Sequence, residues 1–367
     1  MSGPLGKTLA ELRERLPPVP ARRAVELVND GALLVDIREA DEIAQGTPVE
    51  AARYGRGFLE MRLDQNDIAS ERTILLMCAS GARSLLAADE LRRLGYTDTY
   101  SVDGGFDAWK QAGLPFETPA TLDTADRARY ARQITLPEIG EGGQAKLAAA
   151  RVLIIGAGGL GSPVGFYLAA AGVGHIGIVD HDILERSNLH RQIVHRDAAV
   201  GESKARSARD TLAALNPSIH IEPIEQRVTP ETAPELVAGY DLVVDGSDNF
   251  DARFAINDAC VAADIPLIFG AVERFDGQVG LFPAGGQPCY RCLFPEMPPA
   301  EAAPSCADAG VLGAVPGVVG TLQAVEALKH LAGEPDTLAG RILALDTKRQ
   351  HWRTITLPAG GNCDTCG

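Results

Sequence analysis

Short apolar runs alternate along the chain with stretches in which apolar residues recur at helical spacing. The runs are rich in β-branched residues and leucine and end in polar residues or glycine, which is typical of buried parallel strands. The longer periodic stretches between them predict helices. This order predicts a parallel α/β architecture. The expected strands lie at 32–36, 73–77, 100–103, 152–155, 176–179, 219–221, 242–245 and 267–269, and the principal helices at 85–94, 163–171, 201–217 and 250–263.

Residues 115–126, PFETPATLDTAD, interrupt this alternation with proline, threonine and acidic residues, which predicts an interdomain linker. A chain of 367 residues is also long for one domain. We therefore expect a small parallel α/β domain at 1–118, a linker at 119–128 and a larger Rossmann-like domain at 129–367.

The start of the larger domain carries a glycine-rich turn between an apolar strand and a helix. Missing side chains let the backbone approach a phosphate, and the following helix N-terminus offers free N–H groups. The next strand ends in Asp180, where an acid can accept hydrogen bonds from a ribose. A tight turn without a ligand is the alternative, but strand, helix and acid together favour a nucleotide site. The glycines are Gly156, Gly158, Gly159 and Gly161.

Polar residues near other strand ends favour ATP over a nicotinamide dinucleotide. A dehydrogenase needs a flat apolar slot and an acid/base, whereas this domain offers two cations, Arg191 and Lys204, and the acid Asp248. The cations can neutralise a triphosphate, and Asp248 can hold Mg²⁺ against it. Each has a simpler interpretation alone: surface charges for the cations, and a helix N-cap for Asp248. Strand ends of an open sheet meet at one crevice, so we expect Asp180, Arg191, Lys204, Asp248 and Asn249 to gather there.

Four of the seven cysteines form two C-x-x-C pairs, Cys289/Cys292 and Cys363/Cys366. Four thiolates close a tetrahedral Zn²⁺ site and leave no position for substrate, so we expect a structural zinc. Two separate redox pairs are the alternative. Cys260 lies at helical apolar spacing and is expected in the core, while Cys306 lies in a proline- and alanine-rich loop.

Cys78 ends an apolar strand and begins the polar loop CASGARS. A tight loop leading into a helix points backbone N–H groups at such a sulfur, and Arg83 adds positive charge, so the loop favours a thiolate or a persulfide anion. A buried, inert cysteine is the alternative.

The formal net charge of −15 argues against nonspecific binding to nucleic acid or anionic membranes. The sequence contains neither a long uninterrupted apolar window nor a signal-peptide core at its N-terminus, so we expect a soluble, cytoplasmic protein.

Three motifs of the first domain resemble a single-domain rhodanese, a sulfurtransferase module: VDIRE at 35–39, CASGARS at 78–84 and VDGGFDAWKQAG at 102–113. The resemblance covers about 20–118 and implies that Cys78 carries a persulfide and that Asp36 and Arg38 support the fold nearby. The chain departs from the usual pattern at TPVEAARYGRG, residues 47–57, which puts the local backbone there in question.

The second domain resembles the molybdopterin-synthase adenylyltransferases and the related thiamine-pathway and ubiquitin-like activating enzymes. The collinear motifs are RYARQ, GAGGLGSP, VDHD, SNLHRQ, GESKARSA, DGSDN, CYRC, SCADAGVLG and CDTC. The resemblance implies MgATP-dependent adenylylation of the C-terminal glycine of a small ubiquitin-like sulfur-carrier protein ending in Gly-Gly. Sulfur from Cys78, loaded by a cysteine desulfurase-like persulfide donor, would then form a thiocarboxylate.

The same resemblance assigns roles to individual residues. Gly158 and Gly159 touch the nucleotide and Asp180 binds ribose. Arg191 and Lys204 bind phosphates with support from Asn188, and Asp248 supports Mg²⁺. Arg132 reaches the ATP site of a partner subunit, which implies a homodimer. The full expected set comprises catalytic Cys78, Arg132, Arg191, Lys204, Asp248 and Cys306, with Gly156, Gly158, Gly159, Gly161, Asp180, Asn188, Gln192 and Asn249 binding the nucleotide.

Several alternatives stay open at this point. A nicotinamide-dependent oxidoreductase with a noncatalytic, rhodanese-like docking domain is the second hypothesis. Some relatives use the cysteine at the position of Cys306 covalently and others do not. The sequence contains no residue that selects among the molybdopterin, thiamine, tRNA-thiolation and other sulfur-carrier pathways, and His181 has no assigned role.

Overall fold

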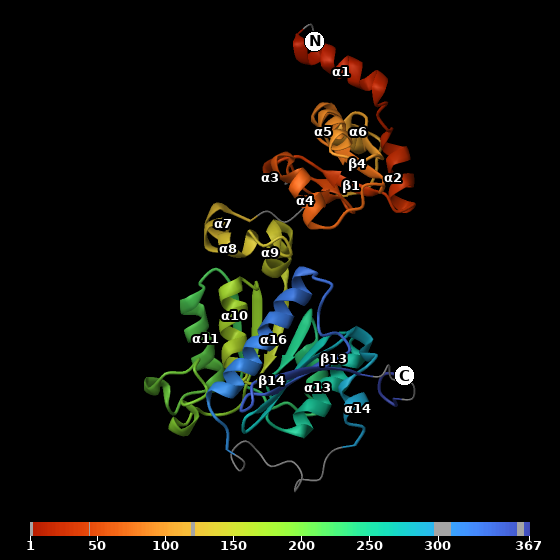
Figure 1. Cartoon of the computed structure of the whole chain (residues 1–367). Coiled ribbons are helices and arrows are strands. Elements are labelled where there is room, and N and C mark those ends of the chain that lie inside the picture. The colour runs from red at the N-terminus through yellow and green to blue at the C-terminus, as the bar shows by residue number, and fades with distance from the viewer. Residues whose placement is uncertain (1–2, 44, 119–121, 297–309, 358–362) are drawn as a thin grey trace. The chain divides into compact units, whose positions relative to one another are not determined.

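The computed structural model describes residues 3–43, 45–118, 122–296, 310–357 and 363–367. The chain divides into two compact units, Met1–Thr121 and Leu122–Gly367 (Figure 1). Cys306 lies outside the described residues, so its predicted role has no structural counterpart here.

The first unit is built on a four-stranded parallel sheet in the order β3-β1-β4-β5. All side chains of β4 (Ile74–Met77) are buried, as expected for a strand covered on both faces. A small antiparallel pair, β2 (Thr47–Pro48) with β6 (Phe116–Glu117), lies beside the main sheet. The other strands are β1 (Leu33–Asp36), β3 (Ala52–Arg53) and β5 (Thr99–Ser101).

Helices cover both faces of this sheet because successive strand residues point to opposite sides. Leu76 packs with residues of α4 (Leu59–Gln65) and α5 (Ala82–Arg93), whereas Leu75 packs with residues of α2 (Ala21–Asn29) and α6 (Gly105–Gln111). The remaining helices are α1 (Pro4–Arg15), α3 (Ala40–Ile43) and the 3₁₀ turn η1 (Arg56–Phe58). The predicted small parallel α/β fold is confirmed.

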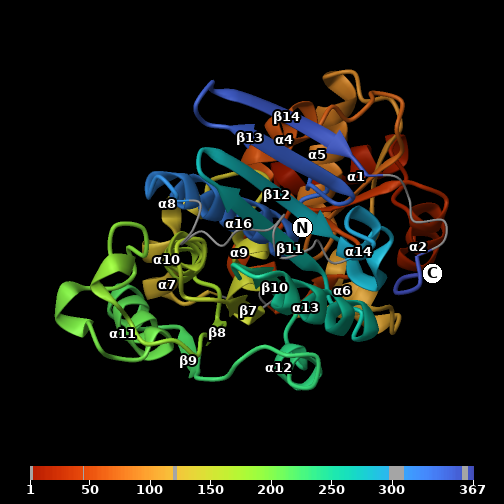
Figure 2. The same ribbon diagram turned by 90° about the horizontal axis from the view of Figure 1, so that it is seen from below.

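The second unit contains an eight-stranded sheet in the order β14-β13-β12-β11-β10-β7-β8-β9 (Figure 2). The chain starts in the middle at β7, runs outward to β9 and then returns to β10 on the other side of β7, so the strand order reverses between β7 and β10. The parallel strands are β7 (Arg151–Ile155), β8 (His175–Val179), β9 (His220–Ile224), β10 (Leu242–Asp245) and β11 (Leu267–Glu273).

Three antiparallel strands extend this sheet beyond the predicted strands: β12 (Asp276–Phe282), β13 (Arg341–Asp346) and β14 (His351–Thr356). Every residue of β14 is exposed. Its sequence, HWRTIT, is not one of the buried apolar runs on which the strand predictions rested.

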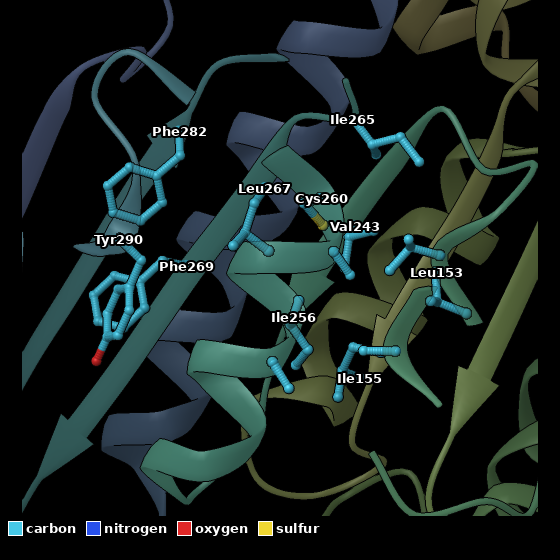
Figure 3. Packing of buried hydrophobic residues seen from close by; sticks show 14 of the residues in the cluster. Leu153, Ile155, Val243, Ile256, Cys260, Ile265, Leu267, Phe269, Phe282 and Tyr290 are labelled. Carbon is cyan, nitrogen blue, oxygen red and sulfur yellow. The ribbon is translucent and has the colours of Figure 1, made fainter. Parts of the chain in front are cut away.

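Two helical layers cover the sheet. Leu153, Val243 and Leu267 point from neighbouring strands toward Ile256 and Cys260 of α13 (Phe250–Ala262), as Figure 3 shows. Cys260 is 1% exposed and burial raises its pKa, so its predicted place in the core is confirmed. The opposite layer contains α10 (Gly161–Ala171), α11 (Lys204–Leu215) and α16 (Ala314–Ala332).

The remaining helical segments of the second unit are short or lie at its start. Within the predicted linker at 119–128, α7 begins at Thr124, and the Asp123 side chain caps this helix by accepting from the Asp126 N–H at 2.7 Å. None of the helices in the described part of the chain is long and apolar enough to span a membrane. The additional elements are α7 (Thr124–Arg129), α8 (Ala131–Ile134), α9 (Gly140–Ala149), α12 (Ala233–Val237), α14 (Tyr290–Leu293) and the 3₁₀ turns η2 (Arg186–Asn188), η3 (Asp197–Ala199) and η4 (Ala284–Gly286).

Candidate functional site

A cavity of about 1270 Å³ opens at the carboxyl ends of the parallel strands of the second unit. This is the position at which open α/β sheets bind ligands, beside the point where strand order reverses. Residues of β7, β8, β11 and β12 and of the turn after β10 reach its wall, together with Pro316 of α16. The predicted residues on the wall are Gly156, Gly158, Gly159, Asp180, Arg191, Gln192, Lys204, Asp248 and Asn249.

Some glycines of the turn line the cavity, and another allows close packing of α10 against β7. Gly156 has φ +90°, a conformation that side chains disfavour. A Cβ on Gly161 would lie 1.8 Å from the Gly156 carbonyl oxygen, so only glycine lets α10 begin so close to β7. Gly158 and Gly159 line the cavity, whereas Gly161 is not on its wall.

Asp180 lies at the tip of β8 and lines the cavity. Its carboxylate accepts hydrogen bonds from the Ala157 N–H at 2.8 Å and the Asp182 N–H at 2.9 Å. Asp180 therefore holds the glycine turn in place as well as facing the cavity, a second role that the sequence pattern did not indicate.

Lys204 is the first residue of α11 and only 7% exposed. Its Nζ lies 2.8 Å from Oδ2 of Asp182, a cavity residue absent from the predicted set. Partial burial alone would raise the pKa of Asp182, but the hydrogen bond and positive charge of Lys204 outweigh burial and lower that pKa. The only signal for Asp182 in the sequence was a second acid close after the strand.

The loop that carries Arg191 is held by Asn188. The Asn188 side chain accepts from the Glu185 N–H at 3.0 Å, and its carbonyl accepts from the N–H groups of Arg191 and Gln192. Asn188 itself does not line the cavity, so it supports the loop from behind. Gln192 is 5% exposed, and its Oε1 has no hydrogen-bond partner among the described residues. This oxygen is therefore available to accept a hydrogen bond from a ligand.

Asp248 and Asn249 share the turn before α13. Asn249 is the N-cap, because its side chain accepts from the Ala252 N–H at 2.9 Å. The alternative interpretation of Asp248 as the N-cap is therefore wrong. Asp248 is exposed and faces the cavity, and Asn249 Nδ2 lies 3.5 Å from its Oδ1.

A buried charged pair behind this turn was missed from the sequence. Asp245 is 2% exposed, and its Oδ2 lies 3.8 Å from Nε of Arg253, a cavity residue. Burial raises the pKa of Asp245 despite the opposing charge of Arg253. The Arg253 guanidinium also donates to the Ser247 carbonyl at 2.9 Å. The only available signal was that Arg253 is the one basic residue in this helix.

Arg132 and His181 differ in their position relative to the cavity. Arg132 is exposed on α8 and is not on the cavity wall. His181, which had no assigned role, lines the cavity and accepts a hydrogen bond from Nε of Arg227 at 3.2 Å.

The four C-x-x-C sulfurs form one cluster, with all Sγ atoms within 4.8 Å of one another. Cys289 lies 3.7 Å from Cys363, and Cys292 lies 3.5 Å from Cys366. A tetrahedral zinc with Zn–S bonds of about 2.3 Å would hold its sulfurs about 3.8 Å apart, so the cluster fits that ion. The sulfurs of different pairs are as close as those within a pair, which disfavours two separate redox pairs.

In the first unit, Cys78 is 1% exposed at the end of β4. Its sulfur accepts hydrogen bonds from the Gly81 N–H at 3.1 Å and from Ser84 Oγ at 3.4 Å. Arg83 donates two hydrogen bonds to Glu42, at 2.7 and 2.5 Å, and its guanidinium also interacts with the Cys78 sulfur. The hydrogen bond from Arg83 lowers the pKa of Glu42.

Asp36 and Arg38 form a buried ion pair at the end of β1, with a shortest N–O distance of 2.6 Å. Arg38 also donates to the Gly46 carbonyl, and Thr47 donates to Asp36 at 2.8 Å. The pair therefore fixes the start of segment 47–57, where the sequence departs from the rhodanese pattern. That segment contains β2, β3 and the beginning of η1.

The sheet is doubly wound, and its strand ends place a glycine turn, two cations and several acids around one cavity. These features define a nucleotide-binding α/β protein. The ThiF family model matches residues 130–365, and the rhodanese-like domain model matches residues 21–112. The chain belongs to the ThiF family and carries an N-terminal rhodanese-like domain. Both resemblances seen in the motifs are confirmed.

Known relatives agree with this assignment. The chain is 49% identical over 254 residues to the adenylyltransferase and sulfurtransferase MOCS3 of Bos taurus, covering 69% of this chain and 56% of that protein. It is 50% identical over 244 residues to the sulfur carrier protein adenylyltransferase of Thermus thermophilus, covering 65% and 90%. The chain thus spans about half the length of the bovine relative. The crystal structure of E. coli MccB with MccA-N7isoASN shares the fold, with a TM-score of 0.58 and 25% identity over 65% of this chain and 74% of that one.

Proposed function

We propose that the second unit adenylylates the C-terminal glycine of a small ubiquitin-like sulfur-carrier protein and that the first unit supplies sulfur from Cys78. The observation that carries the proposal is the gathering of Lys204, Arg191 and Asp248 with the glycine turn around one cavity. Phosphoryl chemistry needs mainly positioning and charge compensation, which these groups provide. The names of the relatives support the same two activities.

In the adenylylation step, a carboxylate oxygen of the carrier attacks the α-phosphorus of ATP. The bond from this phosphorus to the oxygen that bridges to the β-phosphate breaks, and pyrophosphate leaves. Gly158 and Gly159 let the backbone approach the phosphates, and Lys204 keeps donors free beyond the one that binds Asp182. Arg191 and Lys204 offset the negative charge that develops.

Asp248 suits Mg²⁺ because its exposed carboxylate lines the cavity and does not cap a helix. Asp248 would hold the ion, which when bound would supply positive charge to offset the negative charge of the phosphates. Asp180 remains our proposed ribose ligand, with Gln192 and Asn249 on the same wall. Arg132, exposed and away from this wall, would serve the cavity of a second copy, which makes the proposed assembly a homodimer.

In the sulfur step, the terminal sulfur of a Cys78 persulfide attacks the acyl carbon of the carrier adenylate, and AMP leaves. The product is an acyl disulfide on Cys78. An external thiol then attacks the Cys78 sulfur, which releases the carrier thiocarboxylate and leaves a mixed disulfide. The hydrogen bonds from Gly81 N–H and Ser84 Oγ suit an anionic sulfur at this position. We further propose a cysteine desulfurase-like persulfide donor and a cytoplasmic location.

The test combines the protein with MgATP, a persulfide source and carriers that end in Gly-Gly, with intact-mass analysis of the carriers. We expect release of pyrophosphate and replacement of one carrier oxygen by sulfur. A carrier that lacks the last glycine is the matched control and should remain unchanged. If every Gly-Gly carrier tested stays unmodified and no pyrophosphate appears, the proposal is wrong.

We propose that Cys289, Cys292, Cys363 and Cys366 hold a structural zinc, which would tie residues 363–366 to α14, beside the cavity residues Tyr290 and Arg291. Replacing Cys363 with serine should remove bound zinc, measured by elemental analysis, and lower the thermal midpoint of the second unit. Cys260→Ser is the control that should keep full zinc content, since Cys260 lies in the core. Unchanged zinc in Cys363→Ser would contradict the assignment.

A further inference from the structure

His195 connects the three segments that carry the nucleotide-facing groups. It lies in the loop that carries Arg191 and Gln192, and it is only 6% exposed. Its Nε2 lies 2.9 Å from the carbonyl oxygen of Ala157 in the glycine turn. Its Nδ1 lies 2.9 Å from Oγ of Ser207, one helical turn after Lys204 in α11. His195 does not line the cavity, so it acts from behind the wall.

The partners determine how the imidazole bonds. A carbonyl oxygen only accepts, so Nε2 carries the proton and donates to Ala157. Nδ1 then accepts from the Ser207 hydroxyl in the neutral ring. Burial lowers the pKa of His195, and the charge of Lys204 acts in the same direction, whereas Asp180 and the Ala157 carbonyl oppose it. Of the two neutral tautomers, the one protonated at Nε2 is therefore the one that fits both neighbours.

Both backbone polar groups of Ala157 are therefore held, because its N–H donates to Asp180 and its carbonyl accepts from His195. Ala157 lies between Gly156 and Gly158, which have no side chains to fix their positions. Without the imidazole, the buried Ala157 carbonyl would lose its hydrogen-bond donor. Of the two hydrogen bonds that hold Ala157, only the one from its N–H to Asp180 would then remain.

We propose that His195 is a positioning residue for the nucleotide, whose imidazole fixes the glycine turn relative to the Arg191 loop and α11. The inference rests on the proposed function, since it takes MgATP as the ligand of this cavity. Backbone groups that meet the phosphates bind ground state and transition state alike, so a displaced turn should raise KM for MgATP more than it lowers kcat.

Two matched substitutions separate positioning from mere packing. In His195→Gln the side-chain amide can reach Ala157 and donate as Nε2 does. In His195→Asn the shorter amide can bond Ser207 but falls short of Ala157. We expect His195→Asn to raise both KM and the dissociation constant for MgATP by about tenfold, the effect of one net hydrogen bond, and His195→Gln to recover most of that loss.

The measurements are calorimetric MgATP binding and pyrophosphate release with a Gly-Gly carrier, with thermal unfolding as the folding check. Equal affinity in His195→Asn and the unaltered protein, equal loss in both variants, or a fall in kcat alone would each overturn the proposal. If His195→Asn does not fold, Ser207→Ala replaces it: this loss of one hydroxyl should raise KM about threefold, and an unchanged KM would refute the inference. Absence of MgATP binding in the unaltered protein would instead overturn the proposed function, and the inference with it.

Discussion

The two units assemble their chemistry in opposite ways. In the first, the hydrogen-bond partners of the Cys78 sulfur, Gly81 and Ser84, follow within six residues, in the loop after β4 and the first turn of α5. In the second, the cavity wall draws on residues from Ile155 to Pro316, supplied by several strand ends and helices. The first site is a local structure placed on a sheet, whereas the second exists only when the sheet has its full order.

This difference teaches where each site is vulnerable. A loop site depends on a few consecutive residues and on whatever fixes the ends of the loop, such as the buried pair Asp36–Arg38 nearby. A strand-end site spreads binding over many groups, so the loss of one group weakens it without abolishing it. The predictions below test that contrast.

The largest expected effect comes from Cys78→Ser. This change should abolish formation of the carrier thiocarboxylate, because a serine hydroxyl cannot carry a persulfide. Pyrophosphate release with a Gly-Gly carrier should continue at the original rate, since no cavity residue changes. Carrier mass and pyrophosphate are measured in the same reaction. Loss of both activities in a folded variant would show that the two sites are not separable.

Asp36→Asn should destabilise the first unit by about 3–5 kcal/mol, because it leaves the Arg38 guanidinium buried without its carboxylate. Thermal unfolding followed by calorimetry should show one transition shifted down and the other unchanged. Asp89→Asn is the comparison variant, because Asp89 makes its ion pairs with exposed arginines and should matter far less. A joint shift of both transitions in Asp36→Asn would contradict the independence of the units.

Lys204→Met should slow adenylylation by about 10²–10³-fold, as for loss of one positioned charge at a reacting centre. It should leave Cys78 able to accept sulfur, which a cyanide assay for thiocyanate measures directly. Arg206→Met is the control, because Arg206 lies on the same helix but is exposed and pairs with Glu225. Equal losses of adenylylation rate in Lys204→Met and Arg206→Met would contradict a specific role of Lys204, because any positive charge on α11 would then have the same effect.

The smallest expected effect concerns pH. All seven histidines lie in the second unit, and burial lowers the pKa of three of them, His175, His195 and His330, below the ordinary value of 6.5. As pH falls below about 6.5, the unfolded chain binds protons that the folded unit does not, so the free energy of unfolding of the second unit decreases.

The first unit has no histidine and should stay unchanged over the same range, from pH 7 down to about 5.5. Calorimetry at several pH values resolves the two transitions. His195→Gln should flatten the pH dependence of the second transition. A first transition that moves as much as the second would be inconsistent with this account.

The predictability of each part follows from how local its signal is. The parallel strands of the second unit and α10, α11 and α13 were predicted because apolar periodicity and the glycine turn are properties of neighbouring residues, whereas β12 and α16, which also reach the cavity wall, were not. The exposed strand β14 was not, since HWRTIT takes its conformation from pairing with β13. Asp182, Arg253 and His195 also escaped prediction, because their roles depend on partners that only the folded sheet brings near.

The turn before α13 assigns two tasks to two adjacent side chains: Asn249 starts the helix, and Asp248 faces the cavity. Aspartate starts helices as well as asparagine does, so exchanging the two residues would preserve the fold while withdrawing the carboxylate from the cavity. Substitutions at residues 248 and 249 alone can therefore abolish the activity of the cavity, or change its preference for a divalent ion, without altering the fold. A descendant that keeps the scaffold but has given up the reaction could look intact everywhere except at this one turn.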